Sequence, residues 1–275
     1  MDIKSVTSIY FSPTGTTKKI TEAIAKGMRV DKIQTIDCTI PAVRNADTFI
    51  MDSDLIILAI PVYYGRVPKE VVPFLKTLNA HQTPVVLAVV YGNREYDDAL
   101  IELRDISIEQ GLIPVAGGTF IAEHSYSTPT RPIAIDRPDS NDLTQAQTFG
   151  AEIIKKLKAL PSVDDLDDIH IPGNKPYIAP TGLLRINEAK KTISFTPVTD
   201  RNKCKQCNLC IDVCPSSAID SDDVTKIQKW DCLLCFACIK QCPTQAKQMI
   251  DPNFDMAIQQ LQKICLERKE PELFL

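Results

Sequence analysis

Histidine, tryptophan and glycine are scarce in this sequence of 275 residues, with three, one and ten copies. It has no Gly-x4-Gly-Lys-Ser/Thr loop for nucleoside triphosphates and no Gly-x-Gly-x-x-Gly turn for nicotinamide dinucleotides. The sequence also lacks a signal peptide, an apolar run of membrane-spanning length and any DNA-binding element. The net charge of −4 argues against a nucleic-acid surface. We therefore expect a cytoplasmic protein that binds neither membrane nor nucleic acid.

Cysteine, in contrast, is concentrated in one stretch, because eight of the ten cysteines lie between Cys204 and Cys242. They form two copies of the pattern Cys-x2-Cys-x2-Cys-x3-Cys-Pro. Three thiolates on one tight loop can bind three corners of a cubane cluster, and the fourth corner is bound by the last cysteine of the other run. We assign one [4Fe–4S] cluster to Cys204, Cys207, Cys210 and Cys242, and a second to Cys232, Cys235, Cys238 and Cys214.

Clustered cysteines have two other common uses, in zinc sites and in disulfides. Structural zinc usually takes cysteines in pairs, and a disulfide framework needs an oxidising compartment. The spacing favours iron and sulfur over both. The matching tails after Cys214 and Cys242 look like an internal duplication. Over about residues 196–250 the chain resembles a bacterial-type two-cluster ferredoxin.

The first part of the chain alternates apolar strands with helical patterns. We predict strands over 5–11, 32–37, 55–60, 84–90 and 112–121, and helices after residue 17 and over 69–78, 97–110 and 141–160. Such alternation indicates a doubly wound parallel sheet, whose ligands bind at the carboxyl ends of the strands.

The loop after the first strand is rich in hydroxyl groups and leads into a helix. It reads Ser12-Pro-Thr14-Gly15-Thr16-Thr17. Backbone N–H groups and the positive end of the helix dipole attract anions at such a place. A phosphate site is the functional interpretation, and an ordinary capped helix is the structural alternative.

Two further loops at the same edge carry aromatic side chains. They span residues 61–68 and 92–97, and flat rings beside an anion site suit a planar heterocycle. The three loops resemble the phosphate loop and the two flavin-ring loops of flavodoxins. This resemblance implies FMN and a five-stranded sheet of order 2-1-3-4-5. The candidate ring-loop residues are Pro61, Val62, Tyr63, Tyr64, Gly65, Tyr91, Gly92, Asn93, Arg94 and Tyr96. One of the two adjacent tyrosines is expected to face away from the ring.

The predicted organisation is a flavodoxin-like FMN domain (1–160), a linker (161–195), a small α+β ferredoxin domain (196–250) and a C-terminal helix (251–275). His124 begins a proline-rich loop at 122–139, where a chemical role and simple packing are both open. The whole pattern resembles the flavodoxin–ferredoxin fusion proteins of anaerobes.

That resemblance implies an electron-transfer flavoprotein that exchanges electrons with redox partner proteins. The alternatives are a flavin-dependent reductase of a small substrate, with His124, Tyr126 or Arg94 as proton donor, and a redox sensor. A carrier is favoured over an enzyme, and the sequence leaves the donor, the acceptor and the oligomeric state open.

Overall fold

The computed structural model describes residues 1–45, 49–50, 52–178, 186–187, 192–193 and 195–275. The chain forms two compact units. Unit 1 comprises Met1–His124, Ala134–Pro180 and Arg268–Leu275, and unit 2 comprises Ser125–Ile133 and Thr181–Glu267. The chain therefore passes from one unit to the other four times. Among the described helices, none combines the length and apolarity needed to cross a bilayer.

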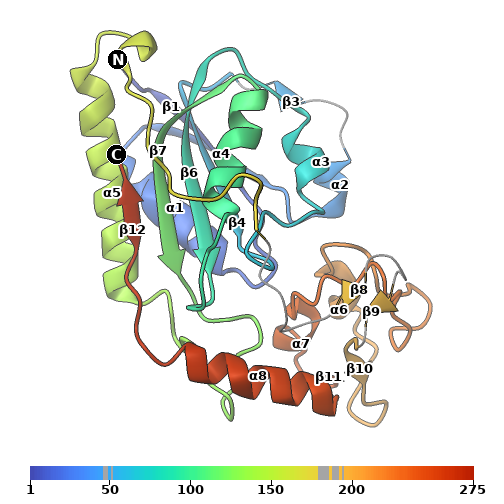
Figure 1. Cartoon of the computed structure of the whole chain (residues 1–275). Helices are drawn as coiled ribbons and strands as arrows, with labels where there is room; N and C mark the ends of the chain where they lie inside the picture. Colours follow the sequence, from blue (N-terminus) through green and yellow to red (C-terminus); the bar gives the residue numbers. More distant parts are fainter. Residues whose placement is uncertain (46–48, 51, 179–185, 188–191, 194) are drawn as a thin grey trace. The chain divides into compact units, whose positions relative to one another are not determined.

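Unit 1 contains a sheet with the strand order β12-β7-β6-β4-β1-β2 (Figure 1). Five of these strands are parallel: β1 (Ser5–Tyr10), β2 (Lys32–Asp37), β4 (Leu55–Pro61), β6 (Thr83–Tyr91) and β7 (Leu112–Ile121). All of β6 is buried, as a central parallel strand covered on both faces should be. The predicted flavodoxin-like sheet of order 2-1-3-4-5 is confirmed.

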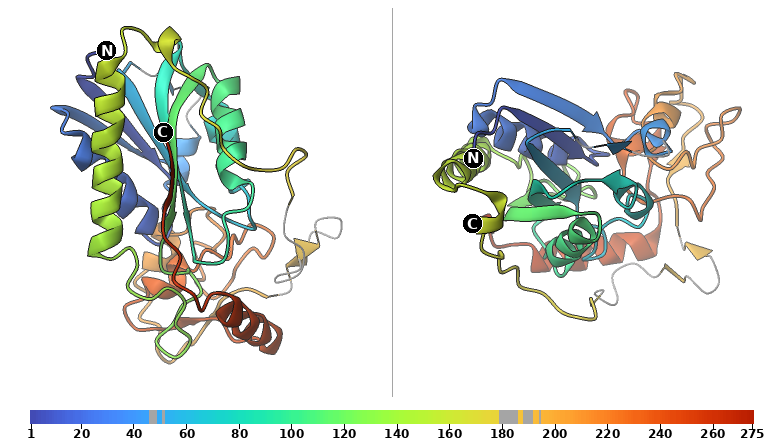
Figure 2. Two further views of the ribbon diagram at one scale, coloured as in Figure 1. Left: turned by 60° about the vertical axis from the view of Figure 1, so that its left-hand side comes forward. Right: turned by 90° about the horizontal axis from the view of Figure 1, so that it is seen from above.

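Helices cover both faces of this sheet. The helices α1 (Thr16–Met28) and α5 (Ser140–Ala159) lie on one face, and α4 (Ala99–Glu109) lies on the other (Figure 2). A Cβ atom on Gly27 would lie 1.9 Å from the carbonyl oxygen of Gln147, and one on Gly150 would lie 2.1 Å from that of Ile24. Only glycine permits this close crossing of α1 and α5.

The sixth strand, β12 (Glu272–Phe274), pairs antiparallel with β7, with Glu272 opposite Thr119. It covers the edge that β7 would otherwise expose. The sequence analysis predicted helix through to residue 275, whereas α8 (Pro252–Ile264) ends well before it. Pro271 disfavours helix just before β12, and three residues are too few to show the alternating pattern of a strand.

Unit 1 also has short elements beside the sheet. They are α2 (Pro41–Arg44), β3 (Phe49–Ile50), α3 (Val72–Leu75), β5 (Leu78–Asn79) and the 3-10 turn η1 (Val163–Asp165). The helix predicted over 69–78 is thus reduced to one turn. Part of the predicted linker belongs to this unit, because Ile169 and Ile171 are buried. Further along, Asp98 accepts hydrogen bonds from the backbone N–H groups of Asn174 (2.8 Å) and Ile178 (2.6 Å).

Unit 2 is built from very short elements. They are β8 (Ile186–Asn187), β9 (Thr192–Ile193), β10 (Val198–Thr199), α6 (Leu209–Asp212), α7 (Ala237–Lys240) and β11 (Lys247–Gln248), followed by the longer α8. The strands pair antiparallel, β8 with β9 and β10 with β11. The helices α6 and α7 begin at equivalent places in the two cysteine runs, which supports the duplication inferred from the sequence.

An apolar cluster joins α8 to the rest of unit 2. It contains Ile133, Phe236, Phe254, Ile258, Leu261 and Cys265. The ring of Tyr126 lies 4.6 Å from that of Phe236, centroid to centroid, so the segment 125–133 contributes to this core. The sequence placed that segment in a loop of the first domain. Each unit is therefore built from segments that are separated in the sequence. A segment as short as 125–133 has no distinct composition, so the sequence does not reveal that it belongs to unit 2.

Candidate functional site

The loop from Ser12 to Thr17 joins β1 to α1 at the carboxyl edge of the sheet. Gly15 is the N-cap of α1 and has a left-handed backbone with φ of 84°. The Ser12 backbone N–H donates to Thr39 Oγ1 (2.7 Å), and Ser12 Oγ accepts from the backbone N–H of Lys18 (3.0 Å). These bonds curl the loop round the start of the helix. Thr14, Gly15 and Thr16 are partly exposed, whereas Thr17 is buried.

The N-terminus of α1 differs from those of the other long capped helices. The carboxylates of Asp139 and Asp251 accept backbone N–H bonds at the starts of α5 and α8. Gly15 has no side chain that can do the same for α1, and its first turn contains no acidic residue. Ser12 Oγ accepts the N–H of Lys18, so a dianionic phosphate here would meet the other N–H groups of the first turn and the positive end of the helix dipole. The residues present fit the phosphate of FMN.

The second loop contains a two-residue turn. Tyr63 and Arg66 exchange both backbone hydrogen bonds (3.1 and 3.0 Å), and Tyr64 and Gly65 have positive φ values of 53° and 72°. These values indicate a type I′ turn, with Tyr64 at its tip and 36% exposed. The ring of Tyr63 packs edge-on against Phe11, 6.5 Å between centroids. Tyr63 thus lies against the residue that precedes the first loop.

An ion pair anchors the second loop to α4. The Arg66 guanidinium donates twice to the Glu102 carboxylate, at 2.7 Å each, and the Val67 backbone N–H donates to the same group at 2.9 Å. The guanidinium also lies over the Tyr177 ring, 4.7 Å from its centroid. Arg66 is therefore committed to holding the loop, which the sequence did not reveal. Upstream, Val62 N–H donates to Val90 O (2.9 Å), which extends the β4–β6 ladder beyond Pro61.

The third loop makes contacts that the sequence did not predict. The Asn93 side-chain oxygen accepts from the Lys269 backbone N–H (3.3 Å), and Arg94 pairs with Asp97. The Tyr96 hydroxyl donates to Glu272 Oε2 (2.9 Å), and burial raises the Tyr96 pKa, with the Glu272 contact adding to the effect. These three side chains were expected at the flavin ring and have other partners here. Their contact with FMN stays a prediction.

Gly92 lies directly against His124. A Cβ atom on Gly92 would lie 2.3 Å from His124 Cδ2. The Ala122 backbone N–H donates to Tyr91 O (2.9 Å), which continues the β6–β7 pairing up to these two residues. Glycine is therefore required at residue 92 for packing. His124 is placed at the edge where the three loops begin, and packing against Gly92 accounts for its position.

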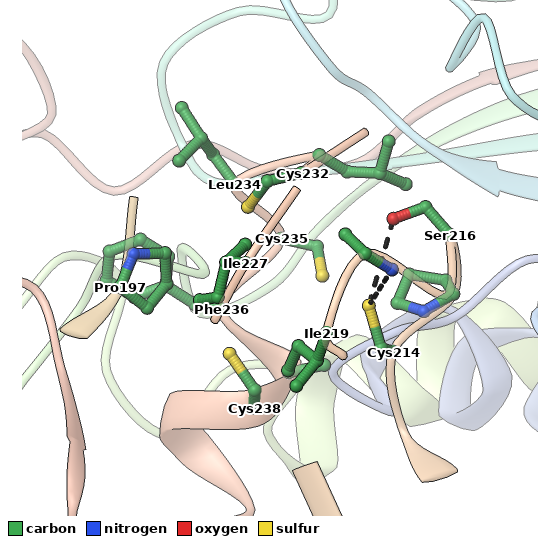
Figure 3. A pocket seen from close by; sticks show the side chains of 14 residues that line it. Pro197, Cys214, Ser216, Ile219, Ile227, Cys232, Leu234, Cys235, Phe236 and Cys238 are labelled. Atoms are coloured by element: carbon green, nitrogen blue, oxygen red, sulfur yellow. Dashed lines mark hydrogen bonds between the residues drawn. The ribbon is translucent and has the colours of Figure 1, made fainter. Parts of the chain in front are cut away.

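The eight cysteines of unit 2 line two cavities. We call the one lined by Cys204, Cys207, Cys210 and Cys242 the first cavity, and the one lined by Cys214, Cys232, Cys235 and Cys238 the second cavity. Figure 3 shows the four sulfur atoms of the second cavity pointing toward its centre. Each cavity joins three cysteines of one run to the fourth cysteine of the other. Four thiols are the ligand set of a [4Fe–4S] cluster, so the residues present fit that group.

Backbone N–H groups point at the sulfur atoms in both repeats. The fourth cysteine of each run accepts from the N–H four residues on, Ala218 to Cys214 at 3.3 Å and Ala246 to Cys242 at 3.2 Å. Six residues of the repeats adopt positive φ at matching places: Gln206, Asn208, Ser217, Leu234, Phe236 and Gln245. These turns wrap each loop round its cavity. Hydrogen bonds to the sulfurs stabilise the thiolate form that binds iron.

The two cavities differ in their surroundings. Cys207 is exposed and Cys235 is buried, although they hold equivalent places. Burial raises the pKa of Cys232, Cys235 and Cys238, that of Cys238 to about 12. The positive charge of Lys247 acts in the opposite direction on Cys238 and also on Cys210. The lining of the second cavity is thus the more apolar of the two.

Two family models match the chain, the flavodoxin domain over residues 8–108 and the 4Fe-4S dicluster domain over residues 203–246. Pyruvate synthase subunit PorD of Methanothermobacter marburgensis is 34% identical over 68 residues, which are 25% of this chain and 82% of that protein. PorD of Methanocaldococcus jannaschii is 36% identical over 55 residues, 19% of this chain and 64% of that protein. A solved flavodoxin from the domain Archaea is 17% identical, with a TM-score of 0.39 over 56% of this chain and 99% of its own.

Proposed function

Given that the chain belongs to the flavodoxin–ferredoxin fusion proteins, we propose that it carries electrons between two redox partner proteins by way of its FMN and its two [4Fe–4S] clusters. One observation supports this above the others: two cavities, each with four cysteines, occur in the same chain as a flavodoxin domain. FMN takes up one or two electrons, and each cluster takes one.

In this proposal the first cavity holds one cluster through Cys204, Cys207, Cys210 and Cys242, and the second holds the other through Cys232, Cys235, Cys238 and Cys214. The loop Ser12–Thr17 binds the FMN phosphate at the N-terminus of α1. Tyr63 and the backbone at Gly65 and Gly92 border the ring. The ion pair of Arg66 with Glu102 keeps the Tyr63 turn in place.

The partner is proposed from the relatives' name. PorD is a subunit of pyruvate synthase, and the identity to it exceeds 30% over most of its length. We therefore propose a 2-oxo acid oxidoreductase of the pyruvate synthase kind as one electron partner, in the cytoplasm of an anaerobe. The exposed Cys207 supports this, because a cluster bound through it would lie near the surface, where a partner protein could exchange electrons with it.

The first experiment is a cofactor inventory with an electron-exchange assay. Anaerobically purified protein should carry FMN and four irons for each of the two clusters, and pyruvate synthase with pyruvate and coenzyme A should bleach its visible absorption. Colourless or zinc-loaded protein would refute the proposal. Turnover of a small substrate without any partner protein would favour the flavin-dependent reductase instead.

A second experiment tests the ligand assignment. Cys242→Ser should damage the cluster bound by Cys204, Cys207 and Cys210, although Cys242 is closer in sequence to the other run. EPR spectra of the reduced variant report which cluster is altered. Cys265→Ser is the matched control, because Cys265 lies in the apolar cluster of α8 and in neither cavity. Loss of the other cluster's signal alone would contradict the exchange of ligands between the runs.

A further inference from the structure

The two cysteine repeats differ at one buried residue that follows the fourth cysteine. Ile219 comes after Ala218 in the first repeat, and Lys247 comes after Ala246 in the second. Both side chains are buried, Ile219 at 5% and Lys247 at 2% exposure. Each also lines the cavity of the fourth cysteine that precedes it, the second cavity for Ile219 and the first for Lys247. A buried apolar residue in one copy thus corresponds to a buried cation in the other.

The Lys247 ammonium has a polar partner, a backbone carbonyl oxygen. Its Nζ donates to the carbonyl oxygen of Val224, which also accepts from Thr199 Oγ1 at 3.2 Å. Among the residues that the structure describes, no carboxylate forms an ion pair with Lys247. Lysine is rarely buried without a counter-charge. The thiolates of the first cavity and the cluster they bind would supply that negative charge.

The loops of the two repeats also differ in polarity, and the loop of the first cavity is again the more polar. The first cavity is lined by Lys205, Gln206 and Asn208, all exposed polar residues. Their equivalents in the second cavity are Leu233, Leu234 and Phe236, and the last two are buried. The loop therefore makes the first cavity the more polar of the two, and the buried Lys247 adds a positive charge to its wall.

We propose that Lys247 makes the two clusters electrochemically unequal, giving the cluster of the first cavity the higher reduction potential. This inference rests on the proposed function. Reduction adds one electron, and hence one negative charge, to a cluster that is already anionic with its four thiolates. A buried cation stabilises that added charge, whereas an apolar lining disfavours it. An electron shared by the pair would therefore reside mainly on the first cluster, near the exposed Cys207.

Neighbouring charges do not reverse this expectation. Asp222 and Asp223 line a neighbouring pocket that shares Cys204 with the first cavity. Asp223 faces Arg201 at 3.7 Å and Lys226 at 3.9 Å, which offset its charge. Lys205 is exposed, so water and salt screen it. Lys247 is the buried charge of the group, and it is part of the wall of the first cavity. Its positive charge also acts on thiols of the second cavity.

The test is an EPR-monitored redox titration of the intact protein and of three variants. The signal of the first cluster is identified with Cys242→Ser. In Lys247→Met we expect the equilibrium constant for reduction of the first cluster to fall at least tenfold, which is about 59 mV for a one-electron couple. The gap between the two midpoint potentials should narrow. Lys247→Arg should keep most of the gap, and Lys205→Met, which removes an exposed charge from the same cavity, should leave it unchanged.

Several results would overturn the inference. One is that the two clusters have equal midpoint potentials in the unmodified protein. Another is that the difference between them is unaltered in Lys247→Met. A third is that Lys205→Met shifts the potential of the first cluster as much as Lys247→Met does. Iron analysis separates failure of this inference from failure of the proposed function. Protein without iron refutes both the proposed function and the role of Lys247. Protein that carries both clusters but has equal midpoint potentials refutes only the role of Lys247. If Lys247→Met does not take up both clusters, Lys247→Gln is used instead, because it removes the charge while keeping a hydrogen-bond donor for the Val224 carbonyl. The redox titration of Lys247→Gln then tests the inference in the same way.

Discussion

The anchor of the second flavin loop provides a quantitative prediction. The Glu102 carboxylate accepts three hydrogen bonds, two from the Arg66 guanidinium and one from the Val67 backbone. Glu102→Gln keeps the size of the side chain but replaces one acceptor oxygen with an NH2 group. That group would face the N–H donors of Arg66, so donor would oppose donor.

The expected cost follows from these contacts. Hydrogen bonds to charged groups contribute about 1.5–3 kcal/mol each, and the substitution removes at least one. Arg66 retains 29% side-chain exposure, so water partly compensates the freed guanidinium, while the Glu102 side chain is only 11% exposed. We expect unit 1 to lose about 2–3 kcal/mol of unfolding free energy. We also expect the Kd of FMN to rise about tenfold, equivalent to about 1.4 kcal/mol, because Tyr63 belongs to the loosened turn.

Urea denaturation followed by far-UV circular dichroism measures the loss, and FMN fluorescence titration measures the affinity. Trp230 is the one tryptophan of the sequence and belongs to unit 2, so its fluorescence should report a transition that the variant leaves in place. Glu109→Gln on the same helix is the control, because Glu109 is exposed and should change stability by less than about 0.5 kcal/mol. Equal effects of the two substitutions would refute the anchoring role.

Three further predictions concern unit 1. Thr14→Ala should weaken FMN binding about tenfold, whereas Thr144→Ala, an exposed hydroxyl on α5, should leave it unchanged in the same titration. Burial alone would raise the pKa of Asp98, but backbone N–H donors from 174–178 outweigh it and hold the pKa below its usual range. This stabilisation is complete above about pH 4 and lost as the pH falls through the lower folded-state pKa, so amide hydrogen exchange in that segment should accelerate only in acid. Gly150→Ala should destabilise the protein by about 2 kcal/mol in denaturation experiments, because the new Cβ meets the α1 backbone; a gain of about 1 kcal/mol from helix propensity would show that the crossing is loose.

The sequence predicted those features whose signal is local. The apolar run over 55–60 and its neighbours gave the parallel sheet, because a strand covered on both faces is apolar throughout. The repeated cysteine spacing predicted which thiols lie together, and the two cavities have the same sets of four. The spacing is informative because each short gap fixes which sulfur atoms one loop can bring to a cluster.

Features that depend on distant partners were not predictable in this way. Tyr96 lies in the expected ring loop, four residues after Gly92, and nothing near it in the sequence indicates that its hydroxyl donates to Glu272. The segment 125–133 has too few residues to show that Tyr126 packs on Phe236. No local pattern marks Lys247 as buried, and its burial and its correspondence to Ile219 are seen only in the structure.

The interleaving of the two units has a consequence for how the protein is made. The strand β12 completes the sheet of unit 1, yet the ribosome must first synthesise all the cysteine loops of unit 2. The nascent sheet therefore keeps an open edge at β7 until residues 272–274 have left the ribosome, and exposed strand edges are prone to aggregate. A gene cut between residues 180 and 181 would leave the sheet unfinished and deprive the cluster unit of residues 125–133.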